Sequence, residues 1–216
     1  MNVPAARLQM VEQQVRAWSV LDPRVLDAMS EVARELYVPA AFKDMAYADS
    51  PIPLSPTVSL FAPSLDGRIL QALGVSPGQS VLEIGTGSGF LAACLSALGA
   101  TVRSIEIDPA LAASATERLK SEGRASVTVE VADAMALAPI AAYDAVIVAG
   151  SLPTYDPRFE QWLRPGGRLF VVVGMHAPME ALLITRVSDI EFQRESLFET
   201  EMAPLLHAHT PSQFSF

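Results

Sequence analysis

A run of closely spaced glycines, Gly85–Gly89 (GTGSG), is the part of the sequence best suited to binding a ligand. It follows the apolar stretch Ser80–Ile84, which predicts a strand, and precedes Phe90–Leu98, which predicts a helix. Glycines at such a turn let a ligand approach the backbone at the N-terminus of a helix. The run does not match the dinucleotide fingerprint, because Phe90 takes the place of its last glycine, and no Gly-Lys-Ser/Thr of a phosphate-binding loop follows.

Three acidic residues stand near the ends of predicted strands. Glu83 interrupts an apolar strand, and a buried carboxylate is costly unless it is hydrogen-bonded or paired with a cation. It therefore either bonds to neighbouring backbone amides or faces a cationic ligand such as S-adenosylmethionine. Glu106 comes about twenty residues after the glycine loop, where an acidic side chain can accept both ribose hydroxyls. Asp133 is equally suited to cap a turn or to contact an adenine.

The elements that position these acids alternate between apolar strands and helices. Near-continuous Val/Ile/Leu strands separated by helices indicate a parallel sheet covered on both faces, a doubly wound α/β fold. The carboxyl ends of its strands meet at one edge, where such folds bind ligands. The predicted strands are Ser80–Ile84, Thr101–Ile107, Val127–Val131, Ala145–Ala149 and Arg168–Val173, with an antiparallel pair at Leu182–Val187 and Phe192–Phe198. The predicted helices are Leu65–Leu73, Phe90–Leu98, Pro109–Ser121 and Arg158–Leu163, the third capped by Asp108.

The first fifty residues predict helices. Leu8, Val11, Val15 and Trp18 recur at helical spacing, and Asp22-Pro23 is typical of an N-cap followed by proline at the first helical position. The segment from Ser50 to Pro63 then carries four prolines and almost no charge. A long apolar connection of this kind is more often a functional segment than a linker.

Composition narrows the class of protein. The chain has 216 residues, of which 50% are hydrophobic and 18% charged, so it can bury a large core. A formal net charge of −9 makes nucleic acid and anionic membrane surfaces poor partners. The uncharged run Ile84–Val102 is long enough to span a bilayer, but its glycines favour a buried loop and helix. With one cysteine and no signal peptide, we expect a soluble, cytoplasmic protein without an internal disulfide.

Several residues that could bind a metal or pack against a ligand have a simpler interpretation. Cys94 lies on an apolar helix face and is expected in the core. The histidines show no metal-ligand spacing, so no metal is expected, and the pair His207 and His209 is expected to be solvated. Trp18 and Trp162 are expected to be packing residues. The closing residues Phe214–Phe216 could pack on the domain or frame the mouth of the site.

The motifs of the sequence also resemble those of a known family. The motifs VLEIGTGSG, SIEID, VAD, YDAVIVAG and LRPGGRL, over roughly residues 64–174, look like those of class I S-adenosylmethionine-dependent methyltransferases. The motifs VEQQV, LDPRVLDAMSEVARELYVP and AYADSPIPL resemble the protein-L-isoaspartate O-methyltransferase family, with its helical N-terminus. The resemblance implies a mostly parallel, seven-stranded Rossmann-like sheet. It divides the chain into an extension with the acceptor-side loop (1–63) and one S-adenosylmethionine-binding unit (64–216).

The resemblance also implies a reaction and its site. The chain would transfer a methyl group from S-adenosylmethionine to isoaspartyl carboxylates of damaged proteins, leaving S-adenosylhomocysteine. The partner would be a protein or peptide, with no nucleic acid or membrane, and a monomer is favoured over an oligomer. The glycine loop and Glu83 would hold the methionine moiety, Glu106 the ribose, and Asp133 the adenine edge. The implied cofactor residues are Glu83, Gly85, Thr86, Gly87, Ser88, Gly89, Glu106, Ile107, Asp133 and Ala134.

The sequence departs from the family at one segment. The family carries Thr-Ile-Ser-(Gln/Ala)-Pro, with an active-site serine, whereas this chain has PTVSLFAP over residues 56–63. Aligning Thr57-Val58-Ser59 keeps the serine but adds two residues before the proline. Aligning Pro63 better preserves the helix length and places Phe61 at the serine position. Ser59 and Thr57 are the candidate catalytic residues, and Ser55 is a further candidate hydroxyl on the loop.

Three alternatives to isoaspartate repair stay open. The first is a divergent relative that binds S-adenosylmethionine without repairing isoaspartate, as an interaction protein or sensor. The second is an enzyme that methylates a small-molecule carboxylate or hydroxyl. An NAD-dependent dehydrogenase is more distant, because Phe90 breaks the fingerprint and no His or Lys dyad suits hydride transfer.

Overall fold

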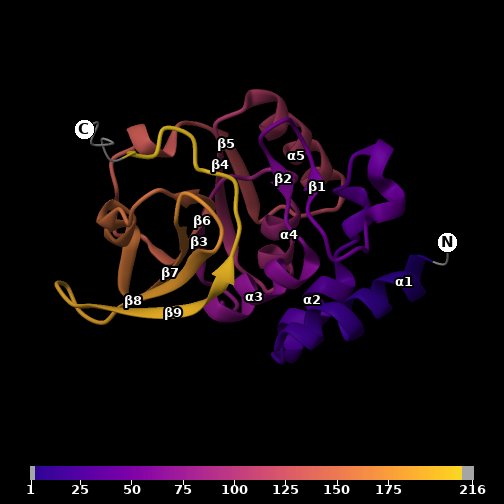
Figure 1. Cartoon of the computed structure of the whole chain (residues 1–216), viewed down its shortest axis with the longest axis horizontal. Coiled ribbons are helices and arrows are strands. Elements are labelled where there is room, and N and C mark those ends of the chain that lie inside the picture. The colour runs from indigo at the N-terminus through magenta and orange to yellow at the C-terminus, as the bar shows by residue number, and fades with distance from the viewer. Residues whose placement is uncertain (1–2, 211–216) are drawn as a thin grey trace.

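A computed structural model of the chain describes residues 3–210, so the predicted role of Phe214–Phe216 lies outside the described residues (Figure 1). A seven-stranded sheet of order β5-β4-β3-β6-β7-β8-β9 forms its centre. The strands from β5 to β7 pair in parallel, whereas β8 and β9 pair antiparallel at one edge. The strands are β3 (Ser80–Ile84), β4 (Thr101–Glu106), β5 (Val127–Val131), β6 (Tyr143–Leu152), β7 (Leu163–Val173), β8 (Met179–Arg186) and β9 (Phe192–Thr200). The predicted fold class and the predicted antiparallel pair are confirmed.

Both faces of the sheet are covered, because successive strand residues point to opposite faces and both sets are apolar. The α-helices contribute to one core cluster, whereas 3₁₀-helices contribute to the other. Along β3, Val81 belongs to one core cluster and Leu82 to the other. Three α-helices lie between or before the parallel strands: α3 (Pro63–Leu73), α4 (Phe90–Ala97) and α5 (Pro109–Ser121). Asp108 caps α5 as predicted. The predicted helix at 158–163 is instead a 3₁₀-helix, Pro157–Trp162, which buries Trp162.

The N-terminal helices pack against α3. They are α1 (Val3–Met10), a π-helix (Val11–Val15), a 3₁₀-turn (Arg16–Trp18), α2 (Pro23–Glu31) and two further 3₁₀ segments (Arg34–Leu36 and Ala40–Met45). A Cβ atom at Gly67 of α3 would lie 2.6 Å from Val15 Cγ1, so this glycine permits the close packing. Asp22 caps α2 by accepting from the Arg24 amide, as predicted.

The predicted apolar face of the first helix is partly wrong. Val11 and Val15 are buried, but Leu8 is 58% exposed and Trp18 is 52% exposed, so Trp18 is not a core residue. The chain passes from an α-helix through a π-helix to a 3₁₀-turn, and each change alters the angle between successive side chains. A constant helical period therefore fails to place residues 8 and 18.

The proline-rich segment 50–63 is a hairpin. Its strands β1 (Ile52–Pro53) and β2 (Ser59–Leu60) pair antiparallel, and Leu54 N donates to Val58 O at 2.8 Å within the turn. Leu60 is buried in the core beside α3 and α4. The hairpin is therefore anchored on one side, and its turn is held over the glycine loop, where a Cβ on Gly87 would lie 3.4 Å from Leu54.

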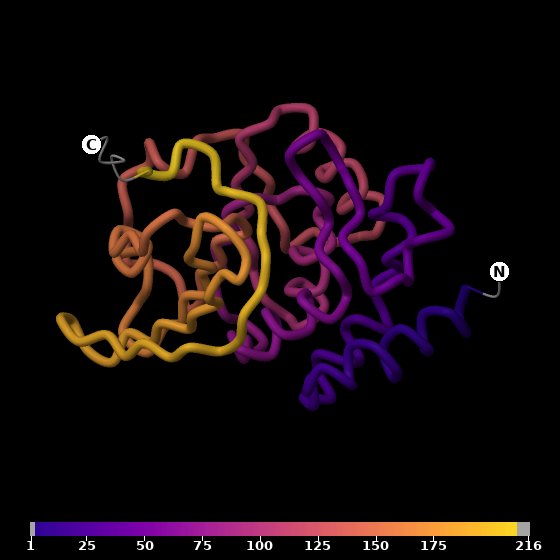
Figure 2. Tube along the Cα trace, viewed as in Figure 1, coloured from indigo at the N-terminus to yellow at the C-terminus, as the bar shows by residue number. Residues whose placement is uncertain are grey.

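After β9 the chain returns across the sheet as the C-terminal segment, residues 201–208. Ser151 of β6 donates its amide to Ala203 O at 2.8 Å and accepts from the Leu205 amide at 2.9 Å. Figure 2 shows this segment in yellow, rising from the end of β9 past the strands. A Cβ atom at Gly150 would lie 2.9 Å from Leu205 Cα, so only glycine permits this approach. No helix in the described part of the chain is both long and apolar enough to cross a membrane.

Candidate active site

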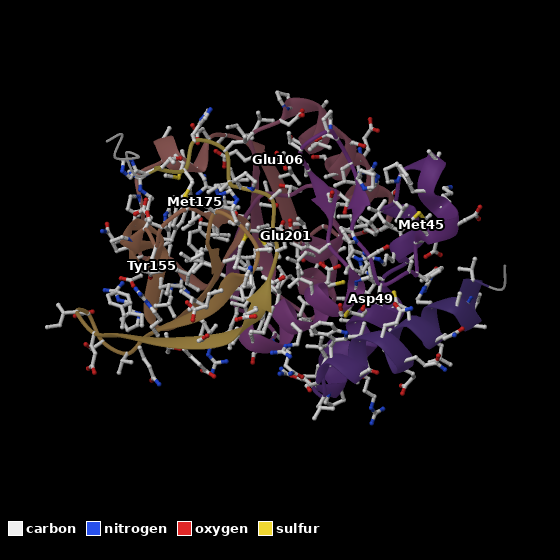
Figure 3. All side chains as sticks on the ribbon, in the orientation of Figure 1. Met45, Asp49, Glu106, Tyr155, Met175 and Glu201 are labelled. Atoms are coloured by element: carbon white, nitrogen blue, oxygen red, sulfur yellow. The ribbon has the colours of Figure 1, made fainter. Side chains whose placement is uncertain are left out.

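A cavity of about 580 Å³ lies at the carboxyl ends of the central strands. Its size is within the range of small-molecule and cofactor sites. Its lining comes from the glycine loop, the ends of β3 to β6, the hairpin, the β7–β8 connection and the C-terminal segment, with single residues of α3 and α4. Figure 3 labels three of its lining residues, Glu106, Met175 and Glu201, which come from widely separated parts of the chain. The cavity is therefore where the fold brings together the residues singled out in the sequence.

Glu83 lies at this cavity and is 1% exposed. Ser104 of β4 donates its hydroxyl to the Glu83 carboxylate, and the Thr86 and Ser104 hydroxyl oxygens are 2.6 Å apart. The carboxylate is thus bonded to a hydroxyl and not to the neighbouring backbone amides considered from the sequence. The pKa of Glu83 is raised to about 8, mainly by burial; the hydrogen bond from Ser104 lowers it, and the charges of Glu106 and Asp66 raise it. A cationic ligand would reverse this shift.

Glu106 connects the end of β4 to the glycine loop. It accepts from the Gly87 amide at 2.8 Å and from the Asp108 amide at 3.1 Å, one through each carboxylate oxygen. Each oxygen can accept a second hydrogen bond, so ribose hydroxyls could still bind there. Glu106 therefore shapes the loop as well as lining the cavity, a role that the sequence did not indicate.

Asp133 caps the 3₁₀-turn Ala134–Ala136 by accepting from the Met135 amide at 2.9 Å, which confirms its capping role. Its other oxygen lies 2.7 Å from His207 Nδ1. This hydrogen bond lowers the pKa of Asp133 below its usual value. His207 is 65% exposed in its side chain, as expected of a solvated residue, but its contact with Asp133 was not predicted. The contact ties the C-terminal segment to the rim of the cavity.

The order of the three acids follows from the sheet. Asp133, Glu106 and Glu83 stand at the ends of β5, β4 and β3, which are adjacent in that order. The glycine loop runs above β3, and Thr86 and Ser88 are buried in it. The remaining predicted cofactor residues also line the cavity, except Gly89, which begins α4: Gly85, Gly87, Ile107 and Ala134. The arrangement suits an elongated ligand with its cationic end at Glu83.

The hairpin forms the opposite wall of the cavity. Thr57, Ser59 and Phe61 all line it; Thr57 and Ser59 are exposed, and Phe61 is half-buried. Ser59 and Phe61 are two residues apart in extended chain and so lie on the same side, opposite the buried Leu60. Ser55 instead stabilises the turn, where its hydroxyl accepts from the Val58 amide at 3.1 Å. The candidate hydroxyls are therefore Ser59 and Thr57.

Sequence reasoning missed a buried ion pair behind this wall. Arg34 and Asp66 are both fully buried, with Arg34 Nη1 2.7 Å from Asp66 Oδ2. Arg34 also donates to Ala46 O at 3.0 Å and to the carbonyl of Phe61. Asp66 lines the cavity with Glu83. A charged residue on the otherwise buried side of a predicted helix was the available signal.

Other missed residues come from the C-terminal third of the chain. Met175, Met179 and Met202 line the cavity together with Leu205 of the C-terminal segment. They give no motif in the sequence. Met175 and Met179 come from the β7–β8 connection and the start of β8, whereas Met202 and Leu205 are brought there by the return of the chain across β6. Cys94 is buried in the core as predicted, and burial raises the pKa of its thiol well above the usual value. Within residues 3–210, no three His, Cys, Asp or Glu side chains are grouped so as to hold a metal ion.

Comparisons with known proteins agree with this geometry. Residues 6–209 match the family model of protein-L-isoaspartate(D-aspartate) O-methyltransferase. The chain belongs to this family. A protein-L-isoaspartate O-methyltransferase from Rhodopseudomonas palustris is 37% identical over 201 residues, which cover 92% of each chain. One from Aeropyrum pernix is 36% identical over 209 residues, covering 94% of this chain and 80% of the relative.

Solved structures show that the fold is shared. A Plasmodium falciparum protein, solved as a protein-L-isoaspartate O-methyltransferase in complex with S-adenosyl-L-homocysteine, superimposes with a TM-score of 0.78. The match covers 92% of this chain and 97% of the other at 18% sequence identity. The predicted resemblance and the Rossmann-like sheet with a helical N-terminus are confirmed.

Proposed function

We propose that this chain transfers the methyl group of S-adenosylmethionine to the free α-carboxylate of isoaspartyl residues in proteins or peptides. The observation that carries the proposal is the arrangement of the cavity. Its cofactor half is built from three adjacent strand ends with an acid at each, and its acceptor half from the hairpin, in a chain of the protein-L-isoaspartate O-methyltransferase family. As biological role and location we propose protein repair in the cytoplasm.

The residues of the cofactor half fit S-adenosylmethionine. Glu83 is a buried carboxylate without a cation of its own, which suits the positively charged methionine end. Glu106 has unused acceptor positions for the ribose hydroxyls, and Asp133 with Ala134 lies where the adenine edge would follow. The glycine loop leaves the backbone open to the ligand. When bound, S-adenosylmethionine supplies an electrophilic methyl group on a sulfonium sulfur.

The acceptor half has little acid–base chemistry to perform. The free α-carboxyl of an isoaspartyl residue, with an ordinary pKa below about 4, is ionised at neutral pH, so no general base is required. The chain must instead align the carboxylate and replace its water with fixed donors. We propose that the Ser59 hydroxyl, with Thr57 beside it, donates to the acceptor carboxylate. The hairpin and the C-terminal segment then exclude water around it.

We propose that residues 1–63 and 64–216 have different roles in the reaction within one folded unit. The first part supplies the acceptor wall and Arg34, and the second supplies the cofactor residues. The cavity between them is closed only when both parts are in place. We propose that the chain acts as a monomer, because one chain supplies every residue named above.

Phe61 favours a second candidate function. If Pro63, which begins α3, marks the alignment, Phe61 stands at the family's serine position and the chain would bind S-adenosylmethionine but act on another acceptor, or on none. Replacing Phe61 with serine tests this in a transfer assay with labelled S-adenosylmethionine and an isoaspartyl peptide. Activity already present in the wild type supports repair. Activity that appears only in Phe61→Ser supports the second candidate.

A further inference from the structure

The Asp66 side chain has an unpaired carboxylate oxygen in the wall of the cavity. Its Oδ2 is paired with Arg34 at 2.7 Å, but its Oδ1 is buried and has no hydrogen-bond partner. An unsatisfied buried polar atom costs free energy and is rare in folded proteins. The residue lies in the wall of the cavity, so a ligand there could supply the missing partner.

The position of Asp66 relative to Glu83 follows from the packing. Val81 packs on the face of the sheet that α3 covers, and Glu83, two residues on, points to the same face. Asp66 is on α3, and both carboxylates line the cavity. The negative charge of Asp66 also contributes to the raised pKa of Glu83, after burial and Glu106. The two carboxylates therefore stand together at the β3 end of the cavity.

A cation would satisfy both carboxylates. Arg34 neutralises the charge of one carboxylate only and is occupied by Asp66, Ala46 and Phe61. The next step rests on the proposed function. In that function, the group that binds at the β3 end of the cavity is the α-ammonium group of the cofactor's methionine moiety. An ammonium has three donors, which is enough for both carboxylates and a backbone carbonyl.

We propose that Asp66 is a further cofactor-binding residue, whose free Oδ1 accepts a hydrogen bond from the methionine ammonium group of S-adenosylmethionine. Arg34 is then a positioning residue: it holds the other oxygen of Asp66 and, through the Phe61 carbonyl, the acceptor hairpin. The cofactor ammonium and the acceptor wall are thereby connected through two buried side chains.

The test compares two ligands on one conservative variant. S-adenosylhomocysteine carries the ammonium group, whereas 5′-methylthioadenosine lacks the whole amino-acid end but keeps the adenosine. In Asp66→Asn we expect the affinity for S-adenosylhomocysteine to fall by about tenfold or more, the loss typical of one hydrogen bond to a charged group. The affinity for 5′-methylthioadenosine should stay within about twofold, with both measured by titration calorimetry.

Asp49→Asn is the matched control. Asp49 accepts from the Ser64 amide at 3.0 Å at the start of the same helix, and it is on the N-terminal side of the molecule (Figure 3). Because Asp49 does not line the cavity and its charge only raises the pKa of Asp66, this variant should lower neither affinity. An equal loss of both ligands in Asp66→Asn, or no loss of S-adenosylhomocysteine, would overturn the proposal, because each outcome gives Asp66 only a structural role.

A second measurement covers the case in which Asp66→Asn does not fold, since breaking a buried ion pair is strongly destabilising. A crystal structure of the wild-type chain with S-adenosylhomocysteine should place the ligand nitrogen within hydrogen-bond distance of Asp66 Oδ1. A water between them, or an ammonium group bound elsewhere, would contradict the proposal. If neither ligand binds the wild type, the proposed function fails instead, so the two failures can be distinguished.

Discussion

At the scale of single residues, the cavity depends on carboxylates whose environments differ. Glu83 is buried beside a hydroxyl, Glu106 accepts two backbone amides, and Asp133 contacts His207. Their pKa values move accordingly: burial raises that of Glu83 to about 8, whereas His207 lowers that of Asp133. Carboxylate groups therefore have three different environments along one edge of the sheet.

The raised pKa of Glu83 predicts a pH dependence of cofactor binding. Below pH 8 the free protein holds a proton on Glu83, which must leave when a cationic ligand binds. The affinity for S-adenosylhomocysteine should therefore increase more than tenfold from about pH 6 to pH 8. Titration calorimetry over this range measures it, and Glu83→Gln should bind weakly with a flat profile. A flat wild-type profile would contradict the role of Glu83.

The raised pKa of Glu83 also predicts that the stability of the free protein decreases as pH rises, opposite to the trend in cofactor affinity. In the unfolded chain Glu83 ionises above its ordinary pKa, whereas in the free folded protein it stays protonated up to about pH 8. Its stabilising contribution is thus complete at low pH and is lost as pH rises through that window. Glu83→Gln should have a higher Tm than the wild type at pH 8 without ligand. An unchanged or lower Tm would show that the Ser104 hydrogen bond outweighs the burial.

We expect turnover to fall when the Ser59 hydroxyl is removed. Its hydroxyl faces the cavity from the hairpin, so Ser59→Ala should lower kcat on an isoaspartyl peptide by about ten- to a hundredfold, the effect of one hydrogen bond to a charged group. The affinity for S-adenosylhomocysteine should not change. Ser76→Ala, at an exposed serine before the amino end of β3, is the control. An unchanged kcat would move the donor role to Thr57, which Thr57→Ala then tests.

At the scale of elements, the sequence predicts what periodicity and capping determine. The strands β3, β4 and β5 agree with their predicted ranges to within one residue, because runs rich in β-branched residues that each follow a glycine turn leave little choice. Three of the four predicted helices in the sheet region form α-helices. The hairpin was expected only as a functional loop, since strands of two residues have no period to detect.

Contacts between distant elements were the part that could not be predicted. The C-terminal segment reaches the cavity through two hydrogen bonds to Ser151, and Asp66 meets Arg34 across 32 positions of sequence. No motif and no regular spacing in the sequence links the C-terminal segment to Ser151, or Asp66 to Arg34. In the N-terminal helices, a change of helix type rotates Trp18 out of the core. These features depend on packing, which local sequence does not encode.

Gly150 provides a test of the C-terminal segment as a wall of the cavity. In Gly150→Ala the new Cβ would lie 2.9 Å from Leu205 Cα, so the segment must shift. We expect the affinity for S-adenosylhomocysteine to fall about tenfold, in line with the cost of overpacking. Gly78→Ala, where a Cβ meets nothing within 4 Å, should leave it unchanged. Equal affinities for Gly150→Ala and wild type would mean that the segment does not contact the ligand.

At the scale of the whole molecule, one core connects the N-terminal helices to the sheet. Met10, Val15 and Met29 belong to the same cluster of buried residues as Ile147 and Phe170 of the central strands. Gly67 allows this packing to be close. The acceptor wall and the cofactor half are therefore fixed relative to one another by shared burial and by Arg34, and not by a flexible hinge.

This shared core predicts a single unfolding transition. Calorimetry should show equal calorimetric and van't Hoff enthalpies for the free chain. S-adenosylhomocysteine at a hundred times its Kd should add about 2.7 kcal/mol to the free energy of unfolding, in the same single transition. Two transitions, of which only one responds to the ligand, would show that residues 1–63 fold apart from the rest.

The most direct test of the central claim uses one synthetic peptide that contains both an aspartyl and an isoaspartyl residue. The peptide is incubated with the wild-type chain and labelled S-adenosylmethionine, and tandem mass spectrometry locates the methyl group. We predict a base-labile methyl ester on the free α-carboxylate of the isoaspartyl residue and none on the aspartyl residue. Binding of S-adenosylhomocysteine without any methyl ester on the isoaspartyl residue would contradict the assignment.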